Sequence, residues 1–353
     1  MSENIKELIK RPLFFEKNRV GRVYTGGALF SKFFGDCSSD GFKPEEWIAS
    51  SVKAINKTPK SEYEGISVIE GTDIRLDMLL DSYKSDILGG RESFGVLTKV
   101  LDSAVRLPVQ AHPDKAFSRK YFNSDYGKAE SWIVLDTRPS ACIYFGFRQK
   151  ISPDDFKSAV NRSKTDKTAM EKLLNRVPVK KGDVFFVPAK MVHAIGKGCL
   201  ILEIQEPTDF TIQPEYYCGD YLLDENEMYI GLDKDTALTV FDYDIFGEDA
   251  VKKGRKTPVT VSSENGVKKE KLITYDDTPC FAVERYTVCE SALVLTNKPA
   301  VYVVTQGNGE ITCGKMKRKI KKGDYFLLPC SAEKAEIKTE SDITVICCLP
   351  PKQ

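Results

Sequence analysis

One segment of the chain occurs twice, and this internal repeat constrains the fold more than any other feature of the sequence. The segment KKGDVFFVPA, which begins at Lys180, aligns without gaps with KKGDYFLLPC, which begins at Lys321. Both copies have a Lys-Lys-Gly-Asp turn, an apolar strand and a proline. A Gly-Asp turn that leads into such a strand is typical of jelly-roll barrels, although ordinary hairpins also produce it. The repeat therefore predicts two copies of one small β unit.

Most of the remaining chain also reads as short strands, in apolar and β-branched runs that end at Gly, Asp, Pro or Asn. Examples are RLPVQAH, ESWIVLD, CLILEIQ and AVYVVTQ. Helical periodicity over residues 74–88 predicts a helix that ends at Gly89. A second helical block, at about residues 152–178, starts at Ser152 and Pro153 and interrupts strands that must pair with each other. The patterns predict a mainly β fold of two jelly-roll barrels with a helical insertion.

The length of the chain and the repeat together predict how the domains are arranged. A chain of 353 residues has room for one large or two ordinary cores. We expect a first domain at residues 1–250, which contains the insertion, and a degenerate C-terminal half at residues 251–353. The polar, Lys-rich segment at about residues 247–271 is predicted to connect them. Lys334 stands in the second copy where the first has His193, so the first copy is predicted to be functional and the second structural.

Charge and apolar patterning exclude several classes of function. The 52 basic and 51 acidic side chains nearly cancel, and no long run of one sign suggests a nucleic-acid or membrane-binding surface. The N-terminus lacks the pattern of a secretion signal, and no apolar stretch approaches the roughly 18 residues of a membrane span. The ten cysteines show no CxxC spacing and are predicted to be reduced core thiols. We expect a cytoplasmic protein with a small-molecule partner; the sequence leaves its oligomeric state open.

The chain contains two histidines, His112 and His193, and the contexts of both predict a metal site. Alternation in RLPVQAH predicts a strand on which Gln110 and His112 share one face. Glu130 begins a strongly apolar strand, where a carboxylate is costly unless it is paired or bound to metal. Two imidazoles, a carboxylate and an amide oxygen suit a roughly tetrahedral zinc site. Alternatives stay open: the histidines could be structural, Gln110 could lie on the surface, and Glu130 could pair with Lys128.

Around these residues the chain reads VQAHPDKAF, then GKAESWIVLD, then GDVFFVPAKMVHAIGKGCLILEIQ. In order, spacing and content these segments resemble the class I mannose-6-phosphate isomerases, and weaker similarity in EEWIASS, ESFGVLTKVLD and the C-terminal half extends the resemblance over most of the chain. The resemblance implies a two-cupin fold and an aldose-ketose isomerase of carbohydrate metabolism that interconverts mannose 6-phosphate and fructose 6-phosphate. It also implies one zinc ion per chain, held by Gln110, His112, Glu130 and His193.

The resemblance implies catalytic roles for three further residues. Isomerisation takes a proton from carbon 2 and returns it to carbon 1 through an enediol, and Glu203 in LILEIQ matches the carboxylate proposed as the base in relatives. Lys128 matches the Gly-Lys motif and is expected to contact a substrate oxygen or phosphate. Gln213 stands where relatives have an arginine, whose fixed charge a glutamine cannot supply. The alternatives are that Glu203 only pairs with a basic side chain and that Lys128 is a solvated charge.

Other departures from the family, and other functions, also remain open. Tyr24 to Gly27 reads YTGG in place of Trp-Gly-Gly, and Pro108 replaces a serine that has a hydroxyl and a backbone donor. A related sugar isomerase or epimerase is the nearest alternative. Two histidines and a carboxylate on a β-barrel also suit a non-haem iron oxygenase, although such an enzyme has no obvious use for an amide ligand. A sugar-binding cupin without turnover is the third possibility.

Overall fold

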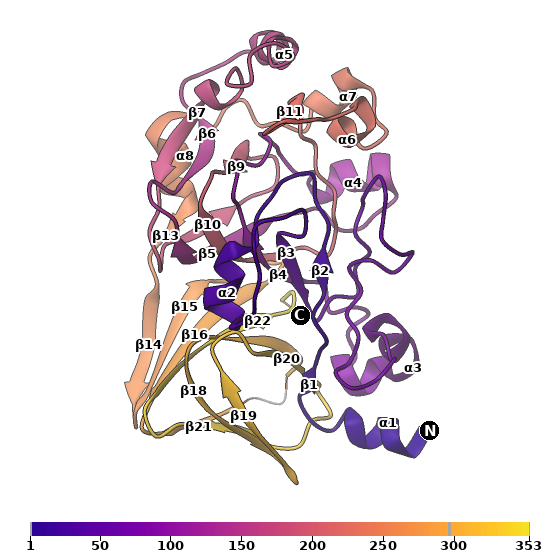
Figure 1. Ribbon diagram of the computed structural model, residues 1–353, viewed down its shortest axis with the longest axis vertical. Helices are drawn as coiled ribbons and strands as arrows, with labels where there is room; N and C mark the ends of the chain where they lie inside the picture. Colours follow the sequence, from indigo (N-terminus) through magenta and orange to yellow (C-terminus); the bar gives the residue numbers. More distant parts are fainter. Residues whose placement is uncertain (1, 296–297, 353) are drawn as a thin grey trace.

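The structure is a computed structural model, and it describes residues 2–295 and 298–352 (Figure 1). The fold is mainly β, as the sequence predicted. Most strands belong to two large antiparallel sheets, which lie one above the other along the longest axis of the molecule. The helices lie around the sheets and at the ends of this axis.

The first large sheet has the strand order β13-β8-β5-β10-β4-β3-β2. Its strands are β2 (Arg19–Val20), β3 (Glu45–Ile48), β4 (Leu97–Asp102), β5 (Glu130–Thr137), β8 (Val184–Val187), β10 (Cys199–Gln205) and β13 (Arg255–Lys256). A small sheet shares a hydrophobic core with it and is made of β6 (Cys142–Phe147), β7 (Leu174–Pro178) and β9 (His193–Ile195). A separate short hairpin pairs β11 (Tyr217–Cys218) with β12 (Tyr221–Leu222).

The second large sheet repeats this order, with the path β1-β20-β18-β22-β16-β15-β14. Its strands are β1 (Leu13–Phe14), β14 (Val259–Glu264), β15 (Val267–Ile273), β16 (Ala282–Cys289), β18 (Ala300–Cys313), β20 (Tyr325–Leu328) and β22 (Asp342–Leu349). The outer part of β18 also pairs with β19 (Met316–Lys321) and β21 (Ala335–Lys338), and β21 pairs with β17 (Ala292–Val294). The strand order supports two copies of one unit, while barrel closure and the domain boundary stay predictions.

The two copies of the repeat have the same local structure. Gly182 and Gly323 have φ angles of 92° and 95°, which a residue with a side chain rarely adopts. The carboxylates of Asp183 and Asp324 each accept a hydrogen bond from the backbone N–H that starts the turn, at 3.1 and 2.8 Å. Each turn leads directly into a four-residue strand, β8 or β20. The shared turn chemistry explains why the repeat was visible in the sequence.

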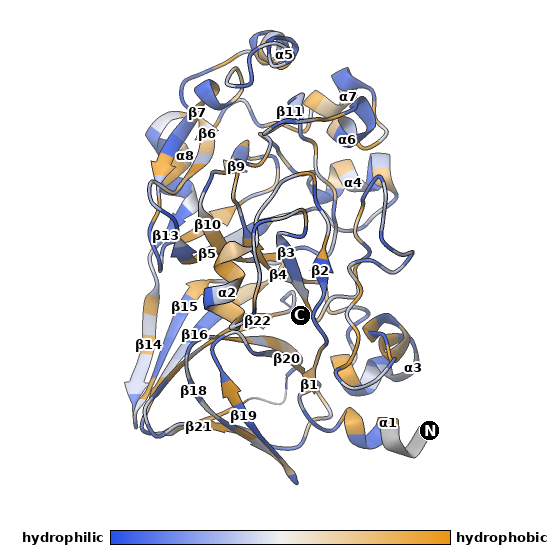
Figure 2. Cartoon of the chain, in the orientation of Figure 1, coloured by the Kyte–Doolittle hydropathy of each residue, from blue (hydrophilic) through white to orange (hydrophobic). Residues whose placement is uncertain are grey.

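A hydrophobic core lies between the two large sheets. In β10, Leu200, Leu202 and Ile204 belong to this core, and Val301 and Val303 of β18 belong to it from the other side. Helix α2 (Ala28–Phe34) contributes buried apolar side chains to the same core, and Figure 2 shows it largely in the hydrophobic colour. Because side chains alternate along a strand, the intervening residues of β10 face away from this core. Glu203 is one of these residues.

The helices confirm some predictions and correct others. They are α1 (Ser2–Leu8), α2, α3 (Leu76–Leu88), α4 (Lys115–Phe122), α5 (Pro153–Arg162), α6 (Glu225–Tyr229), α7 (Lys234–Leu238) and α8 (Gly247–Gly254), with a 3-10 turn, η1 (Glu171–Leu173). Helix α3 ends at Gly89, which has φ 60°, as predicted. The Ser152 side chain caps α5 by accepting a hydrogen bond from the Asp155 N–H. These two ends follow from local sequence signals.

Two segments differ from the sequence predictions. Strands on either side of the insertion do pair, β5 with β8 and β6 with β9. However, residues 174–178 of the expected helical block form β7, because Leu174 and Val177 are buried in the core that the small sheet shares. The expected connector at residues 247–271 does lead from the first large sheet to the second, but it contains α8, β13, β14 and most of β15. In both segments, pairing with strands that are distant in the sequence determined the secondary structure.

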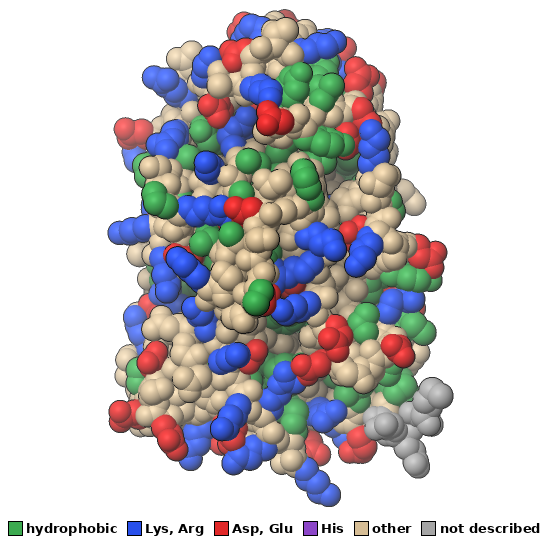
Figure 3. Space-filling model, viewed as in Figure 1, with side chains coloured by type: hydrophobic (Ala, Val, Ile, Leu, Met, Phe, Trp, Pro, Cys, Tyr) green, Lys and Arg blue, Asp and Glu red, His purple; other side chains and the backbone are tan. Residues whose placement is uncertain are grey.

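The surface agrees with the charge pattern of the sequence. Figure 3 shows basic and acidic side chains interspersed over the face that it displays. Within residues 2–295 and 298–352, no helix combines the length and apolarity needed to cross a membrane. The prediction of buried thiols is wrong for Cys37 and Cys289, which are exposed.

Candidate metal centre and active-site cavity

The chain's two histidines lie side by side in the first half of the structure. Their ring centroids are 4.8 Å apart. His193 begins β9, and its backbone exchanges two hydrogen bonds of 2.9 Å with Gln110. The expected strand around Gln110 is reduced to isolated bridges at Gln110 and Ala111, because Pro108 lacks an N–H and the Val109 N–H donates to the Glu215 carboxylate at 2.7 Å. Pairing with His193 therefore holds this segment in place of a regular strand.

The backbone orients both imidazole rings in the same way. His112 Nδ1 lies 3.0 Å from the Phe210 carbonyl oxygen, and His193 Nδ1 lies 2.8 Å from the Met191 carbonyl oxygen. A carbonyl oxygen can only accept a hydrogen bond, so each Nδ1 carries the hydrogen and each Nε2 presents a lone pair. The two Nε2 atoms lie 3.0 and 3.7 Å from the carboxylate oxygens of Glu130. This orientation is the one that metal-binding histidines require.

The donor atoms fit a metal ion. One atom each from His112, Glu130 and His193 lies within 4.8 Å of the others, and all three residues are buried. His193 Nε2 has no hydrogen-bond partner, which is costly for a buried polar atom unless a metal ion occupies its lone pair. Burial lowers the pKa of His112 to about 3 and also lowers the pKa of His193, so both rings are neutral at physiological pH, as a ring that binds a metal ion must be.

Glu130 provides the negative charge of this cluster. Burial opposes its ionisation, but the positive charge of Lys128 holds the pKa of its carboxyl below the usual range. Lys128 is buried, and its Nζ lies 3.1 Å from Glu130 Oε1 and 3.2 Å from the Thr211 hydroxyl. The alternative of a solvated Lys128 is therefore wrong, and Glu130 does pair with Lys128, with the two histidines also beside it. Lys128 is placed to donate to an oxygen next to the candidate metal ligands.

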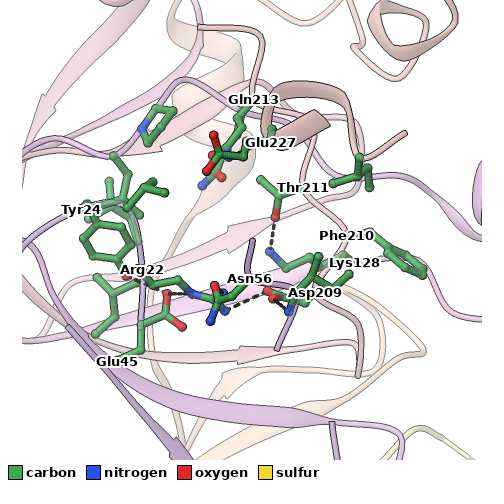
Figure 4. A pocket seen from close by; sticks show the side chains of 18 of the residues that line it. Arg22, Tyr24, Glu45, Asn56, Lys128, Asp209, Phe210, Thr211, Gln213 and Glu227 are labelled. Carbon is green, nitrogen blue, oxygen red and sulfur yellow. Dashed lines mark hydrogen bonds and ion pairs between the residues drawn. The ribbon is translucent and has the colours of Figure 1, made fainter. Parts of the chain in front are cut away.

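A cavity of about 340 Å³ opens beside the cluster, and Figure 4 shows the side chains around it. Gln110, Lys128, Glu130, Glu203 and Gln213 all line it, so the predicted site residues come together with the two histidines behind them. The role of the Gln110 amide as a fourth ligand stays a prediction. Gln213 donates from its Nε2 to the backbone carbonyl of Glu227 at 3.0 Å. The wall that Gln213 shares with α6 therefore has a neutral amide at this position, as the sequence indicated.

Glu203 is the candidate base. It is 2% exposed, and its carboxylate lies 3.2 Å from Lys99 Nζ on the neighbouring strand β4. Burial, followed by the charge of Glu130, raises the pKa of Glu203 to about 8. Glu203 thus does pair with a basic side chain, as the alternative reading proposed, but it also lines the cavity. A buried carboxylate with a raised pKa is a stronger proton acceptor than an exposed one.

Sequence reasoning missed a line of buried charges along the cavity. Arg22 lies 3.1 Å from Glu45 and 3.0 Å from Asp209, and Lys99 lies 3.7 Å from Glu45. The Tyr24 hydroxyl donates to Glu45 at 2.7 Å. Lys99 lies inside the strand LTKVLD, and Glu45 begins the strand EEWI, whose four residues are all buried. The same signal that identified Glu130 would have identified these two, whereas Arg22 and Asp209 lie in loops and have no such signal.

Fold and site together define the class of protein. It is a mainly β protein with a buried His-Glu-His cluster that could hold a metal ion, and this cluster lies beside a cavity lined by several charged side chains. No family model matches the chain. Mannose-6-phosphate isomerase ManA of Bacillus subtilis (strain 168) is 30% identical over 325 residues, which cover 90% of this chain and 93% of that protein. The chain belongs to the mannose-6-phosphate isomerase family.

Solved structures support the same fold. The crystal structure of the mannose 6-phosphate isomerase from Bacillus subtilis has a TM-score of 0.73 and 24% identity, and the match covers 95% of this chain and 99% of that chain. A mannose 6-phosphate isomerase bound with zinc and yttrium has a TM-score of 0.68 at 14% identity, over 97% of this chain and all of that chain. At these identities the likeness describes the fold alone.

Proposed function

We propose that this protein is a zinc-dependent isomerase that interconverts mannose 6-phosphate and fructose 6-phosphate. One observation carries the proposal: both histidines present Nε2 to Glu130 beside a cavity that also contains the buried carboxylate of Glu203. The family relationship supports the choice of reaction. The substrate is a small sugar phosphate, which a cavity of about 340 Å³ is large enough to hold.

The proposed ligands of the zinc ion are Gln110, His112, Glu130 and His193. Zinc accepts such a mixture of nitrogen and oxygen donors in a roughly tetrahedral arrangement. When bound, the ion would polarise the sugar oxygens that change between hydroxyl and carbonyl during the reaction. The unpartnered Nε2 of His193 supports this assignment more strongly than the sequence pattern does.

The side chains of the cavity perform the proton transfer. Glu203 in its carboxylate form takes the proton from carbon 2 of mannose 6-phosphate and returns it to carbon 1, and the intermediate between these steps is an enediol. Carbon 1 gains the proton that carbon 2 loses, and the oxygen on carbon 1 gains a proton while the oxygen on carbon 2 loses one, so atoms and electrons balance without an oxidant or reductant. Lys99 holds Glu203 from the neighbouring strand, and Lys128 donates to a substrate oxygen.

We also propose a division of labour between the two predicted domains. Residues 1–250 supply every residue assigned to the reaction, and residues 251–353 form a second, degenerate jelly-roll unit that packs against the first. The core between the large sheets, to which both halves contribute, supports this packing role.

The test combines metal analysis with a turnover assay. We expect purified protein to contain about one zinc per chain and to interconvert the two hexose phosphates, with incorporation of solvent deuterium at carbon 1 or 2 detected by NMR. Removal of the metal by a chelator should abolish turnover, and added zinc should restore it. Protein that binds one zinc but turns over neither hexose phosphate would contradict the proposed reaction. Protein that is fully active without metal would contradict the role of zinc.

A further inference from the structure

One basic side chain of the cavity has no role in the reaction as described so far. Lys57 lies in the loop between β3 and α3 and lines both the active-site cavity and a second hollow that adjoins it. Its neighbours hold this loop in place, because the Ile55 N–H donates to Asp209 at 2.8 Å and Asn56 accepts a hydrogen bond from Arg22 at 3.1 Å. Lys57 is therefore held where the cavity meets the outer hollow.

The other basic residues that line the cavity, among the residues that the structure describes, are Arg22, Lys99 and Lys128. Their side chains are 11%, 4% and 4% exposed, and each pairs with a buried carboxylate. To leave that partner, each would have to uncover a buried negative charge, which is strongly unfavourable. These three cations therefore stay paired with their buried carboxylates, and none of them can leave its partner to neutralise a phosphate dianion.

Lys57 differs from them because its partner is at the surface. Lys57 Nζ lies 2.6 Å from Asp224, and the two side chains are 56% and 45% exposed. Ion pairs with this exposure contribute little to stability and exchange readily with water or an anion. Asp224 would not be left without a partner, since its other oxygen accepts the Glu227 N–H at 2.9 Å as the cap of α6. Of the four cations, Lys57 is the one that can leave its carboxylate partner for a ligand.

Lys57 lies on the same wall of the cavity as Gln213, the residue that lacks the positive charge of an arginine. Asp224, its partner, caps α6, and Gln213 donates to the carbonyl of Glu227 within α6. Lys57 and Gln213 therefore both lie at the α6 wall of the cavity, one with a positive charge and one without. A phosphate dianion at this wall needs a cation, and a neutral amide cannot supply it.

We propose that Lys57 binds the phosphate group of the substrate and sets the preference for phosphorylated sugars. The hydrogen bond with Asp224 raises the pKa of Lys57, so the side chain is charged at neutral pH and ready to exchange one anion for another. This inference rests on the proposed function for the identity of the sugar, but not for the binding of phosphate. Lys57 acts on binding and not on the proton transfer, which takes place at Glu203.

The first test compares Lys57→Ala with the natural protein, both loaded with zinc. We expect the affinity for inorganic phosphate, measured by calorimetry, to fall about tenfold or more, and KM for mannose 6-phosphate to rise by a similar factor. The kcat should change much less than KM, and zinc content should not change. Lys57→Arg should retain most of the affinity. Lys60→Ala, which alters a lysine of the outer hollow only, is the matched control and should bind phosphate normally.

Two further variants test the exchange of partners. Asp224→Asn keeps the cap of α6 but removes the charge that holds Lys57, so phosphate affinity should rise by a few fold. Gln213→Arg, added to Lys57→Ala, should restore part of the lost affinity by placing a cation on the same wall.

The outcomes separate this inference from the proposed reaction. Unchanged phosphate affinity and unchanged KM in Lys57→Ala would overturn the assignment of Lys57. An equal loss in Lys60→Ala would also overturn it, because the effect would then be one of general surface charge. If the natural protein turns over no hexose phosphate while Lys57→Ala still loses phosphate affinity, the proposed reaction fails and the assignment of Lys57 stands.

Discussion

The two large sheets have the same strand order but very different side chains at equivalent positions. Glu130 of β5 is opposite Val187 of β8, and in the second sheet Ala300 of β18 is opposite Leu328 of β20. The repeat makes Val187 and Leu328 equivalent, so Ala300 occupies the position of Glu130. Trp132 and Tyr302 are equivalent in the same way, because each lies two residues after Glu130 or Ala300. Glu203 of β10 is opposite Trp132, and Cys347 of β22 is opposite Tyr302, so Cys347 occupies the position of Glu203.

The difference shows that the candidate site requires buried carboxylates, each of which is unfavourable unless it has a partner. Ala300 and Cys347 are buried as Glu130 and Glu203 are, but they bury little or no charge. In the first sheet each buried carboxylate needs a partner, which Lys128 and Lys99 supply at 3.1 and 3.2 Å. A few differences at equivalent positions of one strand order therefore distinguish the half that contains the candidate site from the half that does not. The predictions below test this comparison.

The largest expected effect is loss of the metal from the first half. His193→Ala should lose zinc and reduce turnover by more than about 1000-fold, because the remaining ligands hold the ion weakly and one of them is a neutral amide. His112→Ala should behave in the same way. Metal analysis of the purified variants, together with kcat, measures both effects. Full retention of zinc in either variant would show that the cluster is not the metal site.

The next effect concerns the base. Glu203→Gln should lower kcat by about 100- to 1000-fold while zinc stays bound, because the amide has the size of the carboxylate but cannot accept the proton. Cys347→Ser, at the equivalent position of the second sheet, is the control and should leave kcat unchanged. If Glu203→Gln retained normal turnover and normal exchange of the substrate proton with solvent, another group would have to be the base.

Charge can also be added to the second half. Ala300→Glu places a carboxylate where Glu130 lies in the first sheet, but without histidines beside it, so the free energy of unfolding should fall by about 3 to 5 kcal/mol. Chemical denaturation measures the change. Ala300→Gln separates the effect of charge from that of size and should cost less. An equal loss in both variants would mean that size alone matters at this position.

A smaller effect is expected at Gln213. Gln213→Arg should raise kcat/KM on mannose 6-phosphate by about threefold, well below the 100-fold that one preorganised donor can provide, because Lys57 already supplies a cation at that wall. Steady-state kinetics on the natural protein and the variant measures the ratio. A variant slower than the natural protein would show that the pocket has no place for the second charge.

The smallest effect is predicted for Lys334, which takes the place of His193 in the aligned repeat. Lys334 is exposed, and no histidine of the chain lies in the second half, so Lys334→Ala should leave zinc content and turnover nearly unchanged. A large loss of activity in a folded variant would mean that the second half takes part in the reaction. The same assays that follow His193→Ala provide this comparison directly.

Much of the fold and part of the candidate site were predictable because local patterns encode them. The Gly-Asp turns at residues 180–183 and 321–324 identified the repeat, and the caps at Ser152 and Gly89 identified helix ends, since turns and caps depend on a few neighbouring residues. Glu130 stood out because a carboxylate in an apolar strand needs a partner. The roles predicted for Gln110 and Glu203 still await the experiments above.

Only the tertiary structure decided which distant residues meet. The register of β4 against β10 places Lys99 beside Glu203, and loops bring Arg22 and Asp209 to the same cavity. β7 became a strand because Leu174 and Val177 could be buried beside β6, against the helical tendency of the segment before it. Strand register and loop packing depend on contacts between residues far apart in the chain, and a single sequence carries no local signal for them. The sequence by itself thus determined the repeated unit and its buried charges, while long-range packing determined their partners.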